Sequence, residues 1–279
     1  MVDNAVVFDG ISKAGALTSC FILAISYILV FYIKKSPYHR DHPETIKLRC
    51  IRAVGFCIVA PFFIQLLSQT SQEGVSVCHW LGIHLDNVVL AAVLPLLLTM
   101  TLFTGPLTMM FLARELPFMS GFSLSMNMII VRNFIVAPLT EELIYRACMI
   151  PLLVPSMGLV GAVFICPLLF GVAHFHHAIE RLQARENVLN VCLGTLFQFS
   201  YTTLFGIYSA FIFIRTGHFI GPFICHSFCN YMGMPEFDQI SYTKYPKVVA
   251  VMFVIGLLSF ILLLMPLTEP TLYNSVYFR

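Results

Sequence analysis

The chain has 279 residues, of which 58% are hydrophobic and only 11% are charged. Because an ordinary soluble domain carries about 25% charged residues, sixteen basic and fourteen acidic side chains are too few to solubilise a surface of this size. This composition excludes a soluble globular enzyme, a disordered chain and a fibrous repeat, and it predicts a polytopic membrane protein. A net charge of +2, without any basic stripe, also excludes a nucleic-acid partner.

The N-terminal part of the chain predicts two membrane spans joined by a basic loop. Residues 14–33 form an apolar run long enough to cross a bilayer rather than to be removed as a signal peptide. Residues 34–52 hold the densest cluster of Lys and Arg, and residues 53–67 are apolar again. The positive-inside rule therefore places the basic loop in the cytosol and the N-terminus on the opposite side.

The middle of the chain predicts interrupted spans. Residues 88–113 are apolar but contain Gly105-Pro106, where we expect a kink or a break. Residues 122–139 are apolar with few exceptions and lead into two adjacent glutamates. Residues 147–173 carry no charged side chain, and three prolines divide this run.

The C-terminal part predicts one short loop and three further helical segments. Residues 176–186 are expected to form a polar loop, and residues 187–214 a long uncharged span. Residues 216–235 are uncharged but rich in Gly, His and Asn. Residues 248–265 form a plain apolar helix that Pro266 should stop.

A bilayer admits only helices or closed barrels, and these runs lack the period-two alternation of barrel strands. The sequence therefore predicts an all-α fold, a polytopic membrane helix bundle of about eight spans, formed by one domain over residues 1–279. The segments around Pro138 and Pro151 are expected to be broken or re-entrant. Nine cysteines, an odd number without a C-x-x-C pair, are expected to be packing residues rather than disulfides or zinc ligands.

Ionisable groups inside apolar runs carry the functional information, because each costs about 2.5–3.5 kcal/mol on insertion scales. Glu141 and Glu142 are the first such group. On a helix Glu142 faces Arg146, four residues on, whereas Glu141 lies about 100° away and points elsewhere. A carboxylate in a dry setting beside a water is a candidate general base, and Thr140 is a candidate cap of the following helix. The alternative is a solvated cluster at a helix end.

The second group is Phe170 and His174 at the end of an uncharged run, followed by His176 and His177. A neutral imidazole can orient a water or share a proton with it. The alternative for His174 is an interfacial histidine, and this is the favoured interpretation of the two histidines that follow it. A metal site at these three histidines is disfavoured, because their spacing is unusual for zinc and no H-E-x-x-H motif occurs.

The third group is His226 and Asn230, four residues apart on one expected helix face. Two hydrogen-bond donors side by side can bind a developing oxyanion. The alternative is a hydrogen-bonded pair between membrane helices. Among weaker candidates, Arg132 and Asn133 either line a cavity or leave Arg132 at an interface. His218 is expected to mark the end of a span.

Taken in order, the three groups resemble the motif set E-E-x-x-x-R, F-x-x-x-H and H-x-x-x-N of the type II CAAX prenyl endopeptidases, a family of glutamic intramembrane proteases. This chain has E-E-L-I-Y-R at residues 141–146, F-G-V-A-H at 170–174 and H-S-F-C-N at 226–230. Each motif alone is weak evidence. All three in order within about ninety residues of a polytopic helical chain are specific.

The resemblance implies a role for the motif residues around a central catalytic cavity. Glu141 and His174 would activate the attacking water. His226 and Asn230 would stabilise the oxyanion of the transition state. The family resemblance implies no metal and no cofactor.

Glu142 and Arg146 match the remaining motif positions, for which the resemblance implies a supporting role. It also implies removal of the C-terminal a-a-X tripeptide from farnesylated or geranylgeranylated CAAX proteins such as Ras-like small GTPases. The expected location is the endoplasmic reticulum membrane, with a cavity accessible from the cytosol. From the residues alone two other classes stay open: a proton-coupled membrane transporter and a non-catalytic membrane scaffold.

Overall fold

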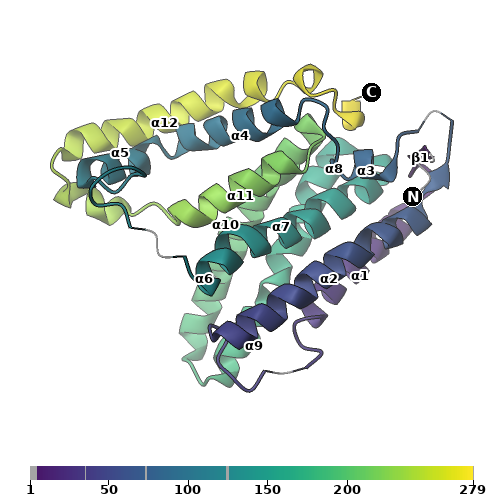
Figure 1. Ribbon diagram of the computed structural model, residues 1–279, viewed down its shortest axis with the longest axis horizontal. Helices are drawn as coiled ribbons and strands as arrows, with labels where there is room; N and C mark the ends of the chain where they lie inside the picture. Colours follow the sequence, from purple (N-terminus) through teal and green to yellow (C-terminus); the bar gives the residue numbers. More distant parts are fainter. Residues whose placement is uncertain (1–4, 35, 73, 124–125, 279) are drawn as a thin grey trace.

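The structure is a bundle of helices (Figure 1). The computed structural model describes four stretches of the chain, residues 5–34, 36–72, 74–123 and 126–278. Two short strands, β1 (Val6–Val7) and β2 (Gln69–Thr70), pair antiparallel and join the residues before the first helix to those after the second. The all-α membrane helix bundle expected from the sequence is confirmed.

Four helical segments in the described residues are long and apolar enough to cross a bilayer, and a fifth if the bent pair α4–α5 counts as one span. They are α2 (Pro43–Leu67), α8 with α9 (Ile150–Gln183), α10 (Val188–Thr216) and α12 (Pro246–Leu267), with α4 (Val88–Leu102) and α5 (Thr104–Ala113) as the bent pair. Helix α1 (Lys13–Leu29) is apolar but only 17 residues long. The number is below the eight expected, because α1, the short segments over residues 128–148 and the 13-residue helix α11 (Ile220–Met232) are each shorter than a counted span.

These short segments form one rod at the centre of the bundle (Figure 1). They are α6 (Met128–Val131), η1 (Arg132–Val136), α7 (Ala137–Glu142) and η2 (Leu143–Cys148). Segments η1 and η2 are π-helical, a widened turn that is frequent at functional sites. The rod contacts α2 on one side and α11 (Ile220–Met232) on the other, so it carries its side chains into the middle of the molecule.

The break expected at Gly105-Pro106 is confirmed, since α4 and α5 are bent by 77° at Phe103. Pro106 lies in the first turn of α5, where a backbone N–H has no partner within the helix. At Gly105 the ring of Phe253 on α12 packs directly on the backbone, and a Cβ would overlap that ring. The bend therefore lets α12 cover both halves of the broken pair.

Residues 176–186, expected as a polar loop, instead contain helix α9 (Phe175–Gln183), so this prediction was wrong. The polar side chains of the segment have partners that the sequence did not reveal. Glu180 accepts hydrogen bonds from Tyr32 and Arg49, which lie near the ends of α1 and α2. These contacts hold the segment against the bundle as a helix.

Helix α8 (Ile150–Ala173) brings the second motif to the centre. It is kinked at Gly158, whose φ of 73° lies in the left-handed region that glycine tolerates. It packs closely on α10. Pro167 of α8 lies so near Gly206 of α10 that a Cβ on this glycine would be 2.8 Å from Cβ of Pro167. The C-terminal end of α8, with His174, therefore reaches the rod and α10 together.

Candidate active site

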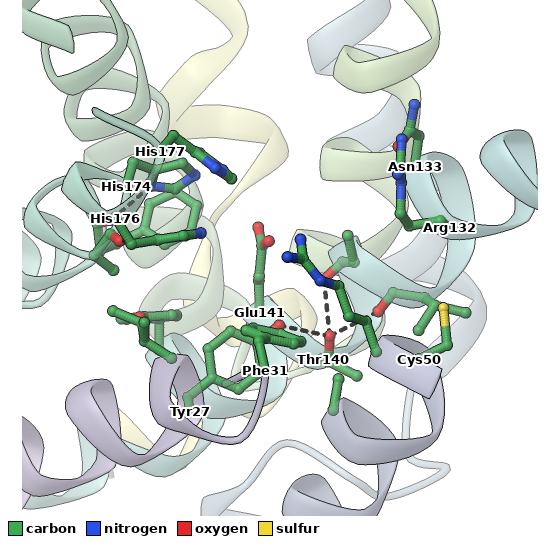
Figure 2. Close-up of a pocket in the computed structure, with 18 of the residues that line it drawn as sticks. Tyr27, Phe31, Cys50, Arg132, Asn133, Thr140, Glu141, His174, His176 and His177 are labelled. Carbon is green, nitrogen blue, oxygen red and sulfur yellow. Dashed lines mark hydrogen bonds between the residues drawn. The ribbon is translucent and has the colours of Figure 1, made fainter. Parts of the chain in front are cut away.

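A cavity of about 180 Å³ opens between α1, α2, the central rod and the junction of α8 with α9 (Figure 2). Its described lining combines aromatic side chains with polar ones, among them three arginines, three histidines and one glutamate. The glutamate is Glu141, on α7. Figure 2 shows its carboxylate reaching up between the histidines at one side and Arg132 with Asn133 at the other.

The two adjacent glutamates face different surroundings, as the helical spacing predicted. The side chain of Glu141 is 21% exposed and lines the cavity. Glu142 is fully buried, and its Oε1 accepts a hydrogen bond from Nη1 of Arg146 at 3.0 Å. The predicted pairing of Glu142 with Arg146 is thus confirmed, and a solvated cluster at this position is ruled out because Arg146 is fully buried too.

Glu142 has two further partners, which come from other helices. Nδ1 of His226 lies 2.7 Å from Oε1 of Glu142, and Oγ of Ser209 donates to Oε2 at 2.6 Å. One carboxylate therefore joins η2, α10 and α11. No local pattern marked Ser209, because a serine within a long apolar helix usually bonds the backbone of its own helix.

Phe170, the first residue of the second motif, lies between the charged groups. The guanidinium of Arg146 stands 4.5 Å from the centre of its ring, a cation–π contact. The same ring meets His174 edge-on, with ring centres 4.8 Å apart. The ring of Phe170 therefore packs against both Arg146 and His174. The four-residue spacing of the motif fits this contact between Phe170 and His174.

His174 follows the last residue of α8 and lines the cavity. Its Nδ1 lies 2.8 Å from the carbonyl oxygen of Phe170, and a carbonyl can only accept. The proton of a neutral ring is therefore on Nδ1, and Nε2 keeps a lone pair. His176 and His177 also line the cavity, at the start of α9 (Figure 2).

His226 and Asn230 lie one turn apart on α11, as the spacing predicted. Nε2 of His226 is 3.8 Å from Oε2 of Glu141, so this ring touches both glutamates. The amide of Asn230 donates to the backbone oxygen of Asn133 at 2.9 Å. Asn230 is exposed, and of the described residues that line the cavity Asn133 is one, whereas His226 and Asn230 are not.

The positions of Thr140, Arg132 and Asn133 test the remaining predictions for this part of the chain. Thr140 does not cap a following helix: it lies inside the continuous rod, and its hydroxyl bonds the backbone oxygen of Val136 and the hydroxyl of Tyr27, both at 2.8 Å. That prediction was wrong because the helix begins well before Thr140. Of the two alternatives for Arg132 and Asn133, the cavity lining is the one observed.

Two basic residues of the lining were missed. Arg40 and Arg49 come from the segment that the sequence analysis treated only as a basic loop. Arg49 donates to Glu180 at 3.1 Å, and Arg132 donates to Asp41 at 2.7 Å. Their nearness to the glutamate motif follows from the packing of α2 on the rod, which no local pattern encodes.

Comparisons with known proteins agree with the motifs. The family model described as "Type II CAAX prenyl endopeptidase Rce1-like" matches residues 123–232, which contain the rod and the whole of α8 and α11. No solved structure gave a significant match.

Several curated relatives are similar over most of the chain. "CAAX prenyl protease 2" of Homo sapiens is 45% identical over 271 residues, which cover 92% of this chain and 82% of the relative. The proteins of the same name from Rattus norvegicus and Arabidopsis thaliana are 40% and 34% identical, covering 81% and 94% of those relatives. The chain therefore belongs to the type II CAAX prenyl endopeptidase family.

Proposed function

We propose that the chain, as one membrane domain over residues 1–279, removes the a-a-X tripeptide from farnesylated or geranylgeranylated CAAX proteins. The observation that carries this proposal is the division between the two glutamates. Glu142 is locked by Arg146, Ser209 and His226, whereas Glu141 faces a cavity that it shares with His174. A carboxylate held by three partners can position the groups around it. A carboxylate that faces a cavity is available to react with a bound molecule.

Glu141 and His174 activate the attacking water in this proposal, without a metal. Nε2 of His174 accepts a hydrogen bond from the water, since Nδ1 is engaged by Phe170. Glu141 takes the water proton as the oxygen attacks the carbonyl carbon of the prenylated cysteine. The proton then passes to the leaving nitrogen, the C–N bond breaks, and the products are a prenylcysteine carboxylate and a free tripeptide amine.

His226 and Asn230 stabilise the oxyanion formed by that attack. Nδ1 of His226 is held by Glu142 at 2.7 Å, and this contact turns Nε2 toward Glu141, the side on which the oxyanion forms in this proposal. Donors of this kind are typically worth about 10²–10³ in rate. Asn230 shifts its amide from Asn133 to reach the oxyanion. Glu142 and Arg146 support the arrangement by holding His226.

The arginines of the lining recognise the free carboxylate at the end of the substrate. This carboxylate lies three residues beyond the scissile bond, so it is roughly 10 Å away in an extended chain. Arg40, Arg49 and Arg132 line the same cavity as Glu141. Guanidinium groups match a carboxylate in charge and geometry, and they position the cysteine carbonyl over the catalytic pair.

The basic segment also orients the protein in the membrane. Arg40 and Arg49 belong to the cluster that the positive-inside rule places in the cytosol, and they line the cavity. The cavity then opens to the cytosol, where Ras-like small GTPases would present prenylated tails. We assign the protein to the endoplasmic reticulum membrane on the family resemblance.

The substitution Glu141→Gln tests the chemistry. It keeps the size and shape of the side chain but removes the base, so tripeptide release from a farnesylated peptide should fall at least 10²-fold. The assay detects the tripeptide by mass with purified protein in detergent, and gel filtration checks that the variant is folded. Full activity of Glu141→Gln contradicts the proposed mechanism.

A further inference from the structure

A second cluster of histidines lies far from the cavity. His79 belongs to the short helix α3 (Val77–Trp80), and His84 and Asp86 follow it before α4 begins. They meet the turn between α10 and α11, where Gly217 and His218 lie. Helix α10, at 29 residues, runs about 43 Å from its start beside α9 to this turn, so the cluster is at the opposite end of α10 from α9.

The hydrogen bond made by His84 fixes which of its nitrogens is free. Nε2 lies 3.2 Å from the backbone oxygen of Gly217, which can only accept, so Nε2 carries the proton. Nδ1 of a neutral ring then has a lone pair. This atom is buried, makes no hydrogen bond within the described chain, and lies 3.8 Å from Oδ2 of Asp86. A lone pair facing a carboxylate is unfavourable unless a cation lies between them.

His79 supplies a third ligand atom to the same place. Its ring stacks on that of His84 with centres 3.9 Å apart, so the two imidazole edges lie side by side. One nitrogen from each ring and one carboxylate oxygen of Asp86 all lie within 4.8 Å of one another. If the three atoms were each 4.8 Å apart, a point midway between them would be about 2.8 Å from each. Bonds from zinc to nitrogen or oxygen are roughly 2.0–2.2 Å long. Each ligand atom would therefore move by under about 1 Å to bind the ion.

The surroundings of the cluster match those of metal sites. A metal-bound histidine almost always donates its other N–H to a carbonyl or carboxylate, as His84 does to Gly217. His218 is fully buried with its ring centre 3.9 Å from that of His84. Neither of its ring nitrogens has a described hydrogen-bond partner at ordinary geometry, although the backbone of Asp86 lies beside it.

We propose that His79, His84 and Asp86 form a binding site for one divalent zinc ion. Two imidazoles and a carboxylate are a ligand set that zinc accepts, and the set is too poor in oxygen for calcium or magnesium. The ion pins the connection before α4 to the turn that starts α11. Because α11 carries His226, the metal fixes a helix of the catalytic site from a distance and takes no part in the reaction.

Zinc binding by the purified full chain in detergent tests this site. After removal of metals with a chelator and dialysis, titration with zinc chloride should give one zinc per chain by calorimetry and elemental analysis. The thermal unfolding midpoint should rise with zinc concentration. Cobalt in place of zinc should give the intense visible bands of a four-coordinate ion with nitrogen ligands.

Matched variants assign the ligands. His84→Gln keeps a donor for the Gly217 carbonyl but removes Nδ1, and it should weaken zinc binding about 100-fold or more. Asp86→Asn, at an exposed position where folding is not at risk, should weaken it about tenfold. The double substitution His176→Ala and His177→Ala removes two adjacent histidines that line the cavity, far from the proposed zinc site, and should leave zinc affinity unchanged.

Three results would overturn the proposal. They are a wild-type protein that binds no stoichiometric zinc, a His84→Gln variant with wild-type affinity, and loss of the zinc in the His176 and His177 variant. None of these readouts depends on peptidase activity, so they stand apart from the proposed function.

Discussion

Glu142 and Arg146 form an ion pair that is closed off from solvent on every side, in a region that the sequence marks as apolar. Taking two charges out of water is costly, and the pair persists because Glu142 has two more hydrogen-bond partners and Arg146 has the face of Phe170. The charges hold His226 in place. Removing one partner leaves the other charge buried without compensation.

The substitution Arg146→Met should therefore lower the free energy of unfolding by about 3–5 kcal/mol. The double variant with Glu142→Gln should recover part of that loss, because no unpaired charge remains. Unfolding in mixed detergent, followed by circular dichroism, measures both. Equal destabilisation by the single and double variants would show that lost packing, not charge, dominates.

Arg132 is the arginine whose contribution to substrate binding can be isolated. It now pairs with Asp41, and this hydrogen bond lowers the pKa of Asp41, so the carboxylate stays ionised until the pH falls below its ordinary range. Arg132→Gln should raise KM at least tenfold, or about 1.4 kcal/mol, for a farnesylated peptide with a free C-terminal carboxylate. For the same peptide with a C-terminal amide, KM should not change.

Asp41→Asn is the control for that substitution. It breaks the same ion pair but leaves Arg132 free, so KM for the free-carboxylate peptide should stay equal or fall. If both variants raise KM alike, for both peptides, Arg132 acts by holding the segment before α2 rather than by binding substrate.

At the residue scale, local spacing was enough for the contacts within one helix. The pairing of Glu142 with Arg146 and the placement of His226 and Asn230 on one helix follow from the pitch of a helix. Contacts between helices were not predictable in this way. Ser209 on Glu142 depends on how α10 packs against the rod, and a single sequence carries no record of that distance.

At the scale of elements, backbones approach closely wherever a glycine leaves room. Gly256 on α12 is one example, because a Cβ there would lie 2.5 Å from the backbone oxygen of Thr101 on α4. Small residues at such crossings are the usual way in which membrane helices gain packing contacts. A backbone oxygen cannot move aside as a side chain does, so α12 must shift if Gly256 is replaced.

Gly256→Ala should lower the free energy of unfolding by about 1–3 kcal/mol. Gly55→Ala on α2 is the matched control, since no atom lies within 4 Å of a Cβ built there. Alanine favours a helix over glycine, so this variant should gain about 0.5–1 kcal/mol. A similar effect of both substitutions on the unfolding midpoint would mean that helix propensity, not the α4–α12 contact, sets the outcome.

Element boundaries were predictable where the signal is chemical and local. Gly105-Pro106 marks the bend between α4 and α5, and the uncharged run at 187–214 corresponds closely to α10. Helix α9 was missed because its polar residues are typical of a loop, and its partners lie about 130 to 150 positions earlier in the chain. Fewer long helices form than the eight spans expected, because the apolar runs at α1, the rod and α11 form shorter helices.

At the scale of the whole molecule, the distribution of apolar side chains is that of a protein surrounded by lipid. Only 11% of the most apolar 18-residue stretch of α12 is buried inside the protein. Leu258, near the middle of this helix, is 55% exposed. In water this would be an aggregating surface. In a bilayer the lipid tails surround this surface, while the charged side chains of Glu142 and Arg146 stay inside the bundle.

Leu258→Asp should therefore interfere with insertion rather than with chemistry. A charge at the centre of a spanning helix costs about 2.5–3.5 kcal/mol on insertion scales. Alkaline carbonate extraction of membranes should release a larger share of this variant than of wild type. A Leu258→Ser control should remain in the membrane fraction, and full retention of the aspartate variant would indicate that α12 does not face lipid.

The contacts of Glu180 bear on how a bulky, lipid-modified tail would reach the proposed catalytic residues. This single carboxylate ties α9 to Tyr32 after α1 and to Arg49 on α2, so three distant parts of the chain close a ring beside the cavity. The side chain is a quarter exposed, and ion pairs of this kind weaken as salt screens them. We therefore expect high ionic strength to loosen the attachment of α9 to α1 and α2 at this side of the cavity.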